Sequence, residues 1–221
     1  MGKDPVVILN FYYPRPGHLD AVLETRLEAS EVRASLALPR GRVLHGGKDA
    51  EGIGQVLWEC GFDDLEAHEL DMTRRAESAA FEAVRARMHE LVARFERTAW
   101  EVVHVDPQPD ESPGQGSVTV LNAYYSTPAK ADSVAAHRIH ASEVRLALGF
   151  HGGRVLRRVH PAPNRTELPQ VLWQMDYPNA QARREDFDAI SATPQFQAVM
   201  TKMRGLADRF ERGLWEVAAS T

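Results

Sequence analysis

The chain has 221 residues, of which 43% are hydrophobic and 26% are charged, and its formal net charge is −5. This is the composition of a globular protein, and it excludes a disordered, collagen-like or disulfide-rich chain. The negative charge provides no basic surface of the kind that binds nucleic acid. Cys60 is the single cysteine, so no intramolecular disulfide can form, which fits a reducing compartment.

The sequence shows neither a secretory signal nor a membrane segment. The N-terminus lacks an apolar core region, and no apolar run approaches the roughly 18 residues that a membrane helix needs. We therefore expect a cytoplasmic protein with no membrane partner and no nucleic-acid partner.

An internal repeat organises the chain. Residues 9–44 and 121–156 align at a constant offset of 112, with 18 identities in 36 positions. After an insertion in the second copy the offset becomes 115, and Gln-Val-Leu-Trp at 55–58 pairs with the same four residues at 170–173. Such a repeat indicates a tandem duplication. The predicted domains are residues 1–105 and 118–221, joined by a Pro/Gly/Ser-rich linker at 106–117.

Both copies show the same predicted order of elements. In the first copy, residues 5–13 are rich in Val, Ile, Phe and Tyr, which favours a strand, and Pro14 and Pro16 separate it from a helix. Two strands follow, at 41–47 and 53–62. After them come a long helix with an apolar stripe, whose last turns run from about 78 to 97, and a closing strand at 98–104. The order β-α-β-β-α-β is that of a ferredoxin-like unit.

The first strand is apolar on both faces, so both faces need cover. One face is covered by the helices of its own copy, and the sheet of the other copy is the natural cover for the second face. We therefore predict an α+β fold in which two tandem ferredoxin-like repeats pack sheet to sheet as an intramolecular α/β barrel.

This pattern resembles the dimeric α/β-barrel superfamily, which includes antibiotic-biosynthesis monooxygenases, haem-degrading enzymes and NIPSNAP-like proteins. The motifs similar to NIPSNAP-like chains are Tyr12-Tyr13-Pro14-x-Pro16-Gly17, the Gln-Val-Leu-Trp strand, and Arg184 followed by Pro194-Gln-Phe196. The resemblance implies the fold and is weak for activity, because the superfamily holds many chemistries. Most members assemble the barrel from two identical chains, so we expect this chain to be a monomer that acts as a pseudo-dimer, or a homodimer.

Arginines fall on the core-facing side of the first helix in both copies. On a helical wheel they share the apolar face, where an arginine is costly unless it is paired. They could form a cationic wall for a carboxylate, phenolate or enolate, form structural salt bridges, or extend to solvent at the helix edge. The residues of this face are Arg26, Ser30 and Arg33 in the first copy, and Arg138, Ser142 and Arg145 in the second. The glutamates that could pair with them are Glu31, Glu143, Glu101 and Glu216.

Polar side chains also interrupt the first strand of each copy. Asn10 and Tyr12 share one face of the strand, and Asn122 and Tyr124 do so in the second copy. An asparagine within an apolar strand requires a hydrogen-bond partner.

Two tryptophans complete this pattern. The resemblance to monooxygenases and haem-degrading enzymes implies an Asn and a Trp beside the substrate, and Trp58 and Trp173 stand at the matching positions. They could hold an aromatic substrate and donate to a developing oxyanion, or they could only fill the core. The haem-degrading pattern also has a histidine where this chain has Arg85 and Met200, which argues against haem.

Histidine content distinguishes the two copies. His137 and His140 occupy the positions of Thr25 and Glu28, and the helical wheel places them away from the core-facing stripe. We expect solvated side chains and no metal site, although one of them could act as a base at a pocket rim. Cys60 is expected to be a small buried side chain rather than a nucleophile.

Together these features predict a small-molecule oxygenase in secondary metabolism, acting on a planar, oxygenated aromatic compound such as a polyketide intermediate. No tightly bound cofactor is expected, and the substrate would react with O₂ directly or with help from reduced flavin supplied from outside. The expected catalytic residues belong to the second copy: Asn122, Trp173, Arg138 and His137. The expected substrate-binding residues are Asn10, Tyr12, Arg26, Arg33, Trp58, Tyr124, Ser142 and Arg145.

Two alternatives stay open. One is a non-catalytic NIPSNAP-like binding or stress protein with structural arginines. The other is a cofactor-free cyclase or isomerase that uses a histidine base on the same fold.

Overall fold

The computed structural model describes residues 5–48, 52–106, 114–162 and 165–219. Within these ranges the protein is α+β, with eight strands, six α-helices and one short 3-10 helix. By its internal contacts the chain divides into two compact units, Met1–Ala99 with Glu216–Thr221, and Trp100–Trp215. None of the described helices is long and apolar enough to cross a lipid bilayer.

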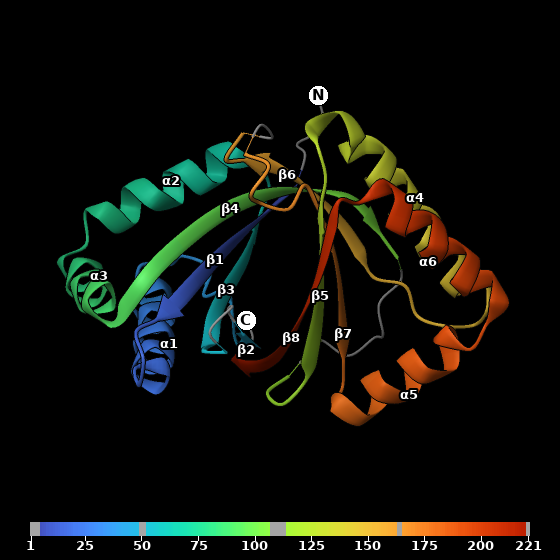
Figure 1. The fold of residues 1–221 in the computed structure, drawn as a ribbon. Coiled ribbons are helices and arrows are strands. Elements are labelled where there is room, and N and C mark those ends of the chain that lie inside the picture. Colours follow the sequence, from blue (N-terminus) through green and yellow to red (C-terminus); the bar gives the residue numbers. More distant parts are fainter. Residues whose placement is uncertain (1–4, 49–51, 107–113, 163–164, 220–221) are drawn as a thin grey trace. The chain divides into compact units, whose positions relative to one another are not determined.

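In the first unit the helices pack on one sheet (Figure 1). Its hydrogen-bonded neighbours run β4-β1-β3-β2-β8, and β3 is antiparallel to both β1 and β2. Helices α1 and α2 contact β3, and α3 packs against α1. The elements are β1 (Val6–Pro14), α1 (Leu19–Ser35), β2 (Arg42–Lys48), β3 (Gly54–Phe62), α2 (Leu65–Ala76), α3 (Ala79–Leu91) and the first part of β4 (Val92–Val105).

The second unit has the same succession of elements. Its strands run β8-β5-β7-β6-β4, and α4 contacts both β6 and β7. The register is equivalent as well, because Asn122 lies opposite Trp173 as Asn10 lies opposite Trp58. The elements are β5 (Val118–Tyr125), η1 (Pro128–Lys130), α4 (Ala131–Ala147), β6 (Arg154–His160), β7 (Val171–Tyr177), α5 (Ala180–Ser191), α6 (Pro194–Leu206) and β8 (Arg209–Ala219).

Strands β4 and β8 each take part in both sheets, so the order of hydrogen-bonded strands is closed. The division between units falls within these two strands and not in the predicted linker at 106–117. The repeat compares stretches of sequence, whereas hydrogen bonds along the strands decide which residues form one unit. The predicted packing of one sheet face on the other stays a prediction.

The single long helix predicted after residue 62 is wrong, because the structure has two helices there and the second ends at Leu91 rather than near residue 97. Helix α2 precedes α3, and the Ser78 hydroxyl starts α3 by accepting a hydrogen bond from the Phe81 amide (3.2 Å). The chain then becomes strand β4 at Val92, so Phe95 lies on a strand, and Phe210 likewise lies on β8. Leu91 and Phe95 are four residues apart, a spacing that fits a helical stripe, and this concealed the change to strand geometry.

Candidate functional site

The first unit contains a hollow of about 380 Å³ between its helices and its sheet. Strands β1 and β4 and helices α1, α2 and α3 all contribute to its wall. The polar lining residues that matter below are Asn10, Tyr12, Arg26, Arg75, His89 and Arg97. The apolar lining includes Phe81, Val84, Met88 and Phe95.

Arg26 presents a buried positive charge to this hollow. Its residue is 4% exposed, and its guanidinium carbon lies 5.1 Å from the centre of the Trp58 ring. Nη2 donates to the Ser30 hydroxyl (3.1 Å), while Nε has no hydrogen-bond partner among the described residues. Burial lowers the pKa of Arg26, and Tyr12 partly opposes that effect. No carboxylate of the described chain forms an ion pair with Arg26, so a bound anion would compensate its charge.

Arg33 has a structural role instead. It is 1% exposed, and its guanidinium donates to both carboxylate oxygens of Asp71 (2.6 and 3.1 Å) and to the Pro39 carbonyl (2.6 Å). Arg33 was predicted to bind substrate, but it does not line the hollow. The alternative of a salt bridge is confirmed for Arg33, but its partner is Asp71 rather than Glu31, which pairs with exposed Arg40.

Two further arginines of the hollow were not predicted as site residues. The Arg97 Nε donates to the Asn10 side-chain oxygen (3.0 Å), which gives the strand asparagine the partner it requires. Arg75 lies 2.8 Å from Asp71 through Nε, and its guanidinium faces the Phe81 ring at 5.1 Å. Burial lowers the pKa of both arginines. Arg97 was missed because its segment was predicted as helix, although Arg212 stands at the same position of the second copy.

Trp58 supports the two α1 arginines and does not reach the hollow. Arg33 lies 4.7 Å from its ring centre, on the same indole as Arg26. The indole N–H donates to the Arg40 carbonyl (2.8 Å), so it is not available to a substrate. Gly41, with φ +69°, passes so close that an added Cβ would lie 2.3 Å from the indole nitrogen. The indole of Trp58, held by its own hydrogen bond, therefore packs against both guanidinium groups and orients them.

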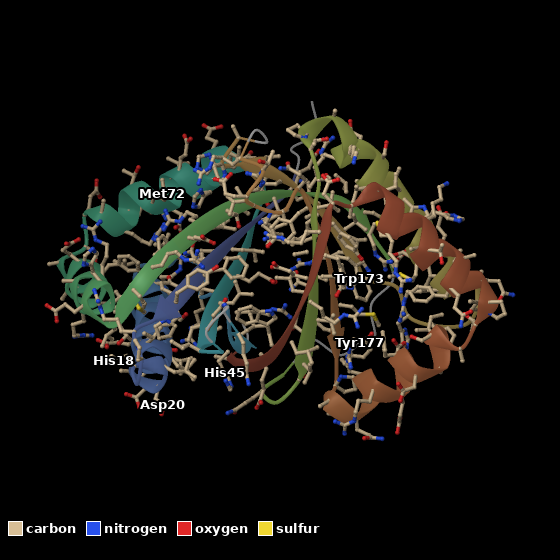
Figure 2. The ribbon with its side chains drawn as sticks, in the orientation of Figure 1. His18, Asp20, His45, Met72, Trp173 and Tyr177 are labelled. Atoms are coloured by element: carbon tan, nitrogen blue, oxygen red, sulfur yellow. The ribbon has the colours of Figure 1, made fainter. Side chains whose placement is uncertain are left out.

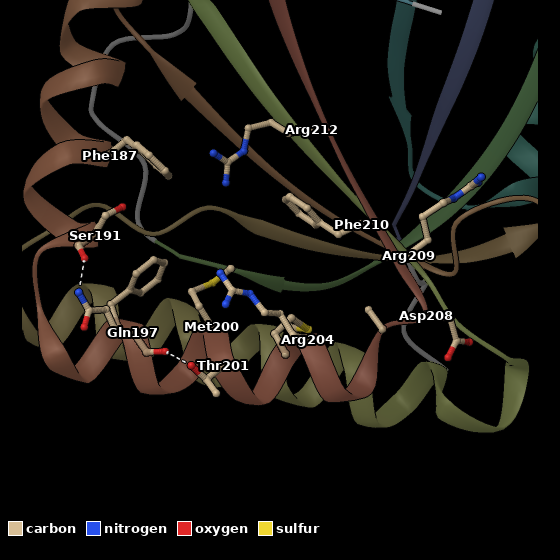
Figure 3. A pocket seen from close by; sticks show the side chains of 13 residues that line it. Phe187, Ser191, Gln197, Met200, Thr201, Arg204, Asp208, Arg209, Phe210 and Arg212 are labelled. Atoms are coloured by element: carbon tan, nitrogen blue, oxygen red, sulfur yellow. Dashed lines mark hydrogen bonds between the residues drawn. The ribbon is translucent and has the colours of Figure 1, made fainter. Parts of the chain in front are cut away.

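The second unit brings the predicted catalytic residues together but leaves little room among them. Asn122, Tyr124, Arg138, Arg145 and Trp173 all line a cavity of only about 30 Å³. A separate hollow of about 770 Å³ lies between α5, α6 and β8 (Figure 3). The residues that line both spaces are Phe187, Phe196, Met200 and Arg212. The room expected in the second copy therefore lies outside the predicted residue cluster.

Arg145 repeats the pairing of Arg33. Its Nη2 lies 2.8 Å from both carboxylate oxygens of Asp186, which also accepts from the Tyr177 hydroxyl (2.8 Å). Trp173 and Tyr177 extend from the same side of β7 (Figure 2). Glu143, the glutamate considered as a partner for this arginine, does not pair with it. It lies at an exposed position near His140.

His137 is buried, contrary to the expectation of a solvated side chain. It is 7% exposed, and its Nε2 donates to the Val199 carbonyl of α6 (2.9 Å). It lines neither space of the second unit, so the structure gives no support for its predicted catalytic role. His140 is exposed as expected. Ser142, predicted to bind substrate, is fully buried and also lines neither space.

Among the described residues, the lining of the hollow includes arginines and no carboxylate, so the charge next to a bound ligand is positive. Burial, together with the charges of Arg97 and Arg75, lowers the pKa of His68 to about 4. Burial raises the pKa of the Cys60 thiol to about 11, so this thiol is a poor nucleophile, as expected. The described residues include no group of three or more His, Cys, Asp or Glu side chains that could hold a metal ion.

No protein-family model and no curated protein matches the chain. Solved structures with the same fold include a proposed monooxygenase from Lactobacillus acidophilus (TM-score 0.64, 12% identity, 98% of this chain and 96% of that chain). A proposed monooxygenase from Fusobacterium nucleatum is similar over 99% and 94% of the two chains (TM-score 0.67, 10% identity). An anthrone oxidase-like protein is similar over 97% and 91% (TM-score 0.65, 17% identity).

At these identities the likeness shows the fold alone. The α+β barrel fold that the resemblance implied is therefore confirmed. The three neighbours span nearly the whole chain, so they include both of its units.

Proposed function

We propose that this protein is an oxygenase that binds an acidic aromatic compound in the hollow of the first unit. The observation that carries the proposal is Arg26, a buried guanidinium that has no carboxylate partner in the described chain and lines an aromatic hollow. A phenolate, enolate or carboxylate on the ligand would supply the missing negative charge.

The remaining wall fits the same class of ligand. The volume of the hollow, about 380 Å³, is within the range of small-molecule sites. The rings of Tyr12, Phe81 and Phe95 offer apolar faces to a planar substrate. Arg75 and Arg97 add positive charge on the side of α2 and β4.

The chemistry follows from stabilising the substrate anion. A carbon acid next to a phenol or ketone loses a proton to form an enolate, which the arginines stabilise. His89 is the lining histidine that can accept this proton. The enolate transfers electrons to O₂ and forms a carbon-bound hydroperoxide, which loses water, so a CH₂ group and O₂ give C=O and H₂O.

Reduced flavin as a co-substrate is the second route. In that case flavin provides the two electrons, one oxygen atom enters the substrate and the other leaves as water. We place the reaction in secondary metabolism, on a polyketide-like aromatic. The shared fold with an anthrone oxidase-like protein and two proposed monooxygenases supports this choice.

We also propose that the two units are duplicated ferredoxin-like modules. The matching positions of Asn10 and Asn122, and of Asp71 and Asp186, support this origin, since each pair occupies the same element of its unit. Loss of Arg75, which is Ile190 in the second unit, marks the divergence of the two sites.

The test is oxygen consumption with anthrones and hydroxynaphthalenes, measured with and without reduced flavin. We expect Arg26→Met to lower kcat/KM by about 10- to 100-fold, the loss of one charge-assisted hydrogen bond. Arg40→Met is the matched control, because Arg40 is exposed and its side chain pairs only with Glu31 among the contacts of the described chain.

Three outcomes would overturn the proposal. Turnover without oxygen consumption would indicate a cyclase or isomerase. Tight binding without turnover would indicate a binding protein. Loss of activity in Arg138→Met but not in Arg26→Met would move the site to the second unit.

A further inference from the structure

The small cavity of the second unit is bordered by donors that have no acceptor. Arg138 is 2% exposed and lies 4.4 Å from the centre of the Trp173 ring. Its Nε and the indole Nε1 of Trp173 are buried without a hydrogen-bond partner in the described chain. The Ser142 hydroxyl, one turn along α4, is buried in the same unsatisfied state. A buried polar group that is left unpaired destabilises the folded state, and three such groups lie close together here.

The first unit shows how the equivalent donors are normally satisfied. There the Arg40 carbonyl accepts from both the Ser30 hydroxyl (3.0 Å) and the Trp58 indole (2.8 Å). Gly152 stands at the position of Arg40, and neither Ser142 nor Trp173 reaches a carbonyl at that point. The second unit has therefore kept the donors and lost their common acceptor.

Neighbouring carboxylates do not replace that acceptor. Asp106 raises the pKa of Arg138 through space, against the dominant lowering by burial. However, its oxygens contact His104 (2.7 Å) and the Gly153 amide (3.2 Å). Asp186 is occupied by Arg145 and Tyr177. The charge of Arg138 is thus without a bonded counter-ion in the described part of this unit.

The missing group must accept hydrogen bonds and carry negative charge. Water meets only the first requirement, and its own hydrogens would need acceptors. Two lining side chains offer amide or carboxylate oxygens, but Asn122 already accepts from Arg212 (2.9 Å), and Asp186 accepts from Arg145 and Tyr177 (2.8 Å each). A volume of about 30 Å³ has room for one water-sized particle. We propose that this cavity binds a small monovalent anion of halide size, held by Arg138 and the Trp173 indole.

The cavity has a route to solvent. Phe187 and Arg212 line both the small cavity and the larger hollow, and Figure 3 shows them extending toward the same space from α5 and β8. The Arg212 guanidinium lies 4.8 Å from the Phe187 ring centre. A rotamer change at this pair would admit an ion. This site is independent of the oxygenase proposal, which concerns the first unit.

The probe is bromide, which quenches a contacting indole. We expect titration of the wild-type protein with sodium bromide, at constant ionic strength in sodium gluconate, to give saturable quenching and a higher midpoint of thermal unfolding. Trp173→Phe should remove the quenching, whereas Trp58→Phe should keep it. Arg138→Met should weaken the apparent affinity by about tenfold or more.

Arg138→Lys is the milder variant if Arg138→Met does not fold, and it should weaken bromide binding without removing it, because it keeps the positive charge but not the guanidinium donors. Quenching that rises linearly and equally in the wild-type and Arg138→Met proteins would overturn the proposal. Absence of any bromide effect would show that the cavity holds water only. Loss of saturation in Arg26→Met alone would assign the ion to the first unit.

Discussion

Asp71 neutralises two arginines in the first unit, which makes it the position where a single substitution should be most damaging to stability. Asp71 is 3% exposed and Arg33 is 1% exposed, so solvent screens their charges very little. Asp71→Asn keeps the size of the side chain but leaves Arg33 without a counter-charge and Arg75 without its ion pair. Breaking one partner of a buried pair costs about 3–5 kcal/mol.

The assay is urea unfolding followed by tryptophan fluorescence. With a slope of about 2–3 kcal/mol/M, the expected loss lowers the unfolding midpoint by about 1–2.5 M. Glu31→Gln is the control, because the Arg40–Glu31 pair is 50% and 66% exposed. An exposed pair contributes at most about 1 kcal/mol. Equal shifts for the two variants would refute the assignment of Asp71 as the buried counter-ion. The double variant Arg33→Met/Asp71→Leu should recover the part of the loss that comes from Arg33, whereas Arg75 still lacks its ion pair.

Two further predictions concern buried side chains. In halide-free buffer, Trp58→Phe should destabilise the protein by about 1–2 kcal/mol more than Trp173→Phe, because of these two indoles only that of Trp58 donates to a backbone carbonyl. Thermal unfolding measures the difference, and equal losses would contradict the prediction. His68 has a folded-state pKa of about 4, below the ordinary value near 6.5, so the unfolded chain binds more protons between these values and stability falls as the pH drops from about 6.5 to 4. His68→Gln should make that decline shallower in unfolding curves measured across this range, and an unchanged slope would show that other groups cause it.

The repeat and the strand alternation predicted most of the fold. The offset of 112 paired Asn10 with Asn122, and the structure places both opposite a tryptophan in the same register. The two helices at 65–76 and 79–91 were predicted as one because the break between them is a two-residue turn. A turn this short leaves the helical spacing of apolar residues nearly intact.

The site was predicted less completely, for a different reason. The helical wheel correctly placed Arg26 and Arg33 on the buried face, but it cannot tell a paired arginine from an unpaired one. That distinction depends on Asp71, which is 38 residues from Arg33 and was not singled out. The sequence predicted the catalytic residues in the second copy. The volume beside each polar cluster depends on side chains from other elements, such as Phe81 of α3 and Phe187 of α5.

The sharing of β8 between the units has a consequence for synthesis of the protein. The first sheet needs residues 216–219 beside β2, and the ribosome makes these residues only after the segment 100–215 of the second unit. Until then the edge of β2 has unsatisfied backbone groups that can pair with other chains. The first unit is therefore incomplete while the second unit is made, and a chaperone that covers this edge would be most useful during that interval.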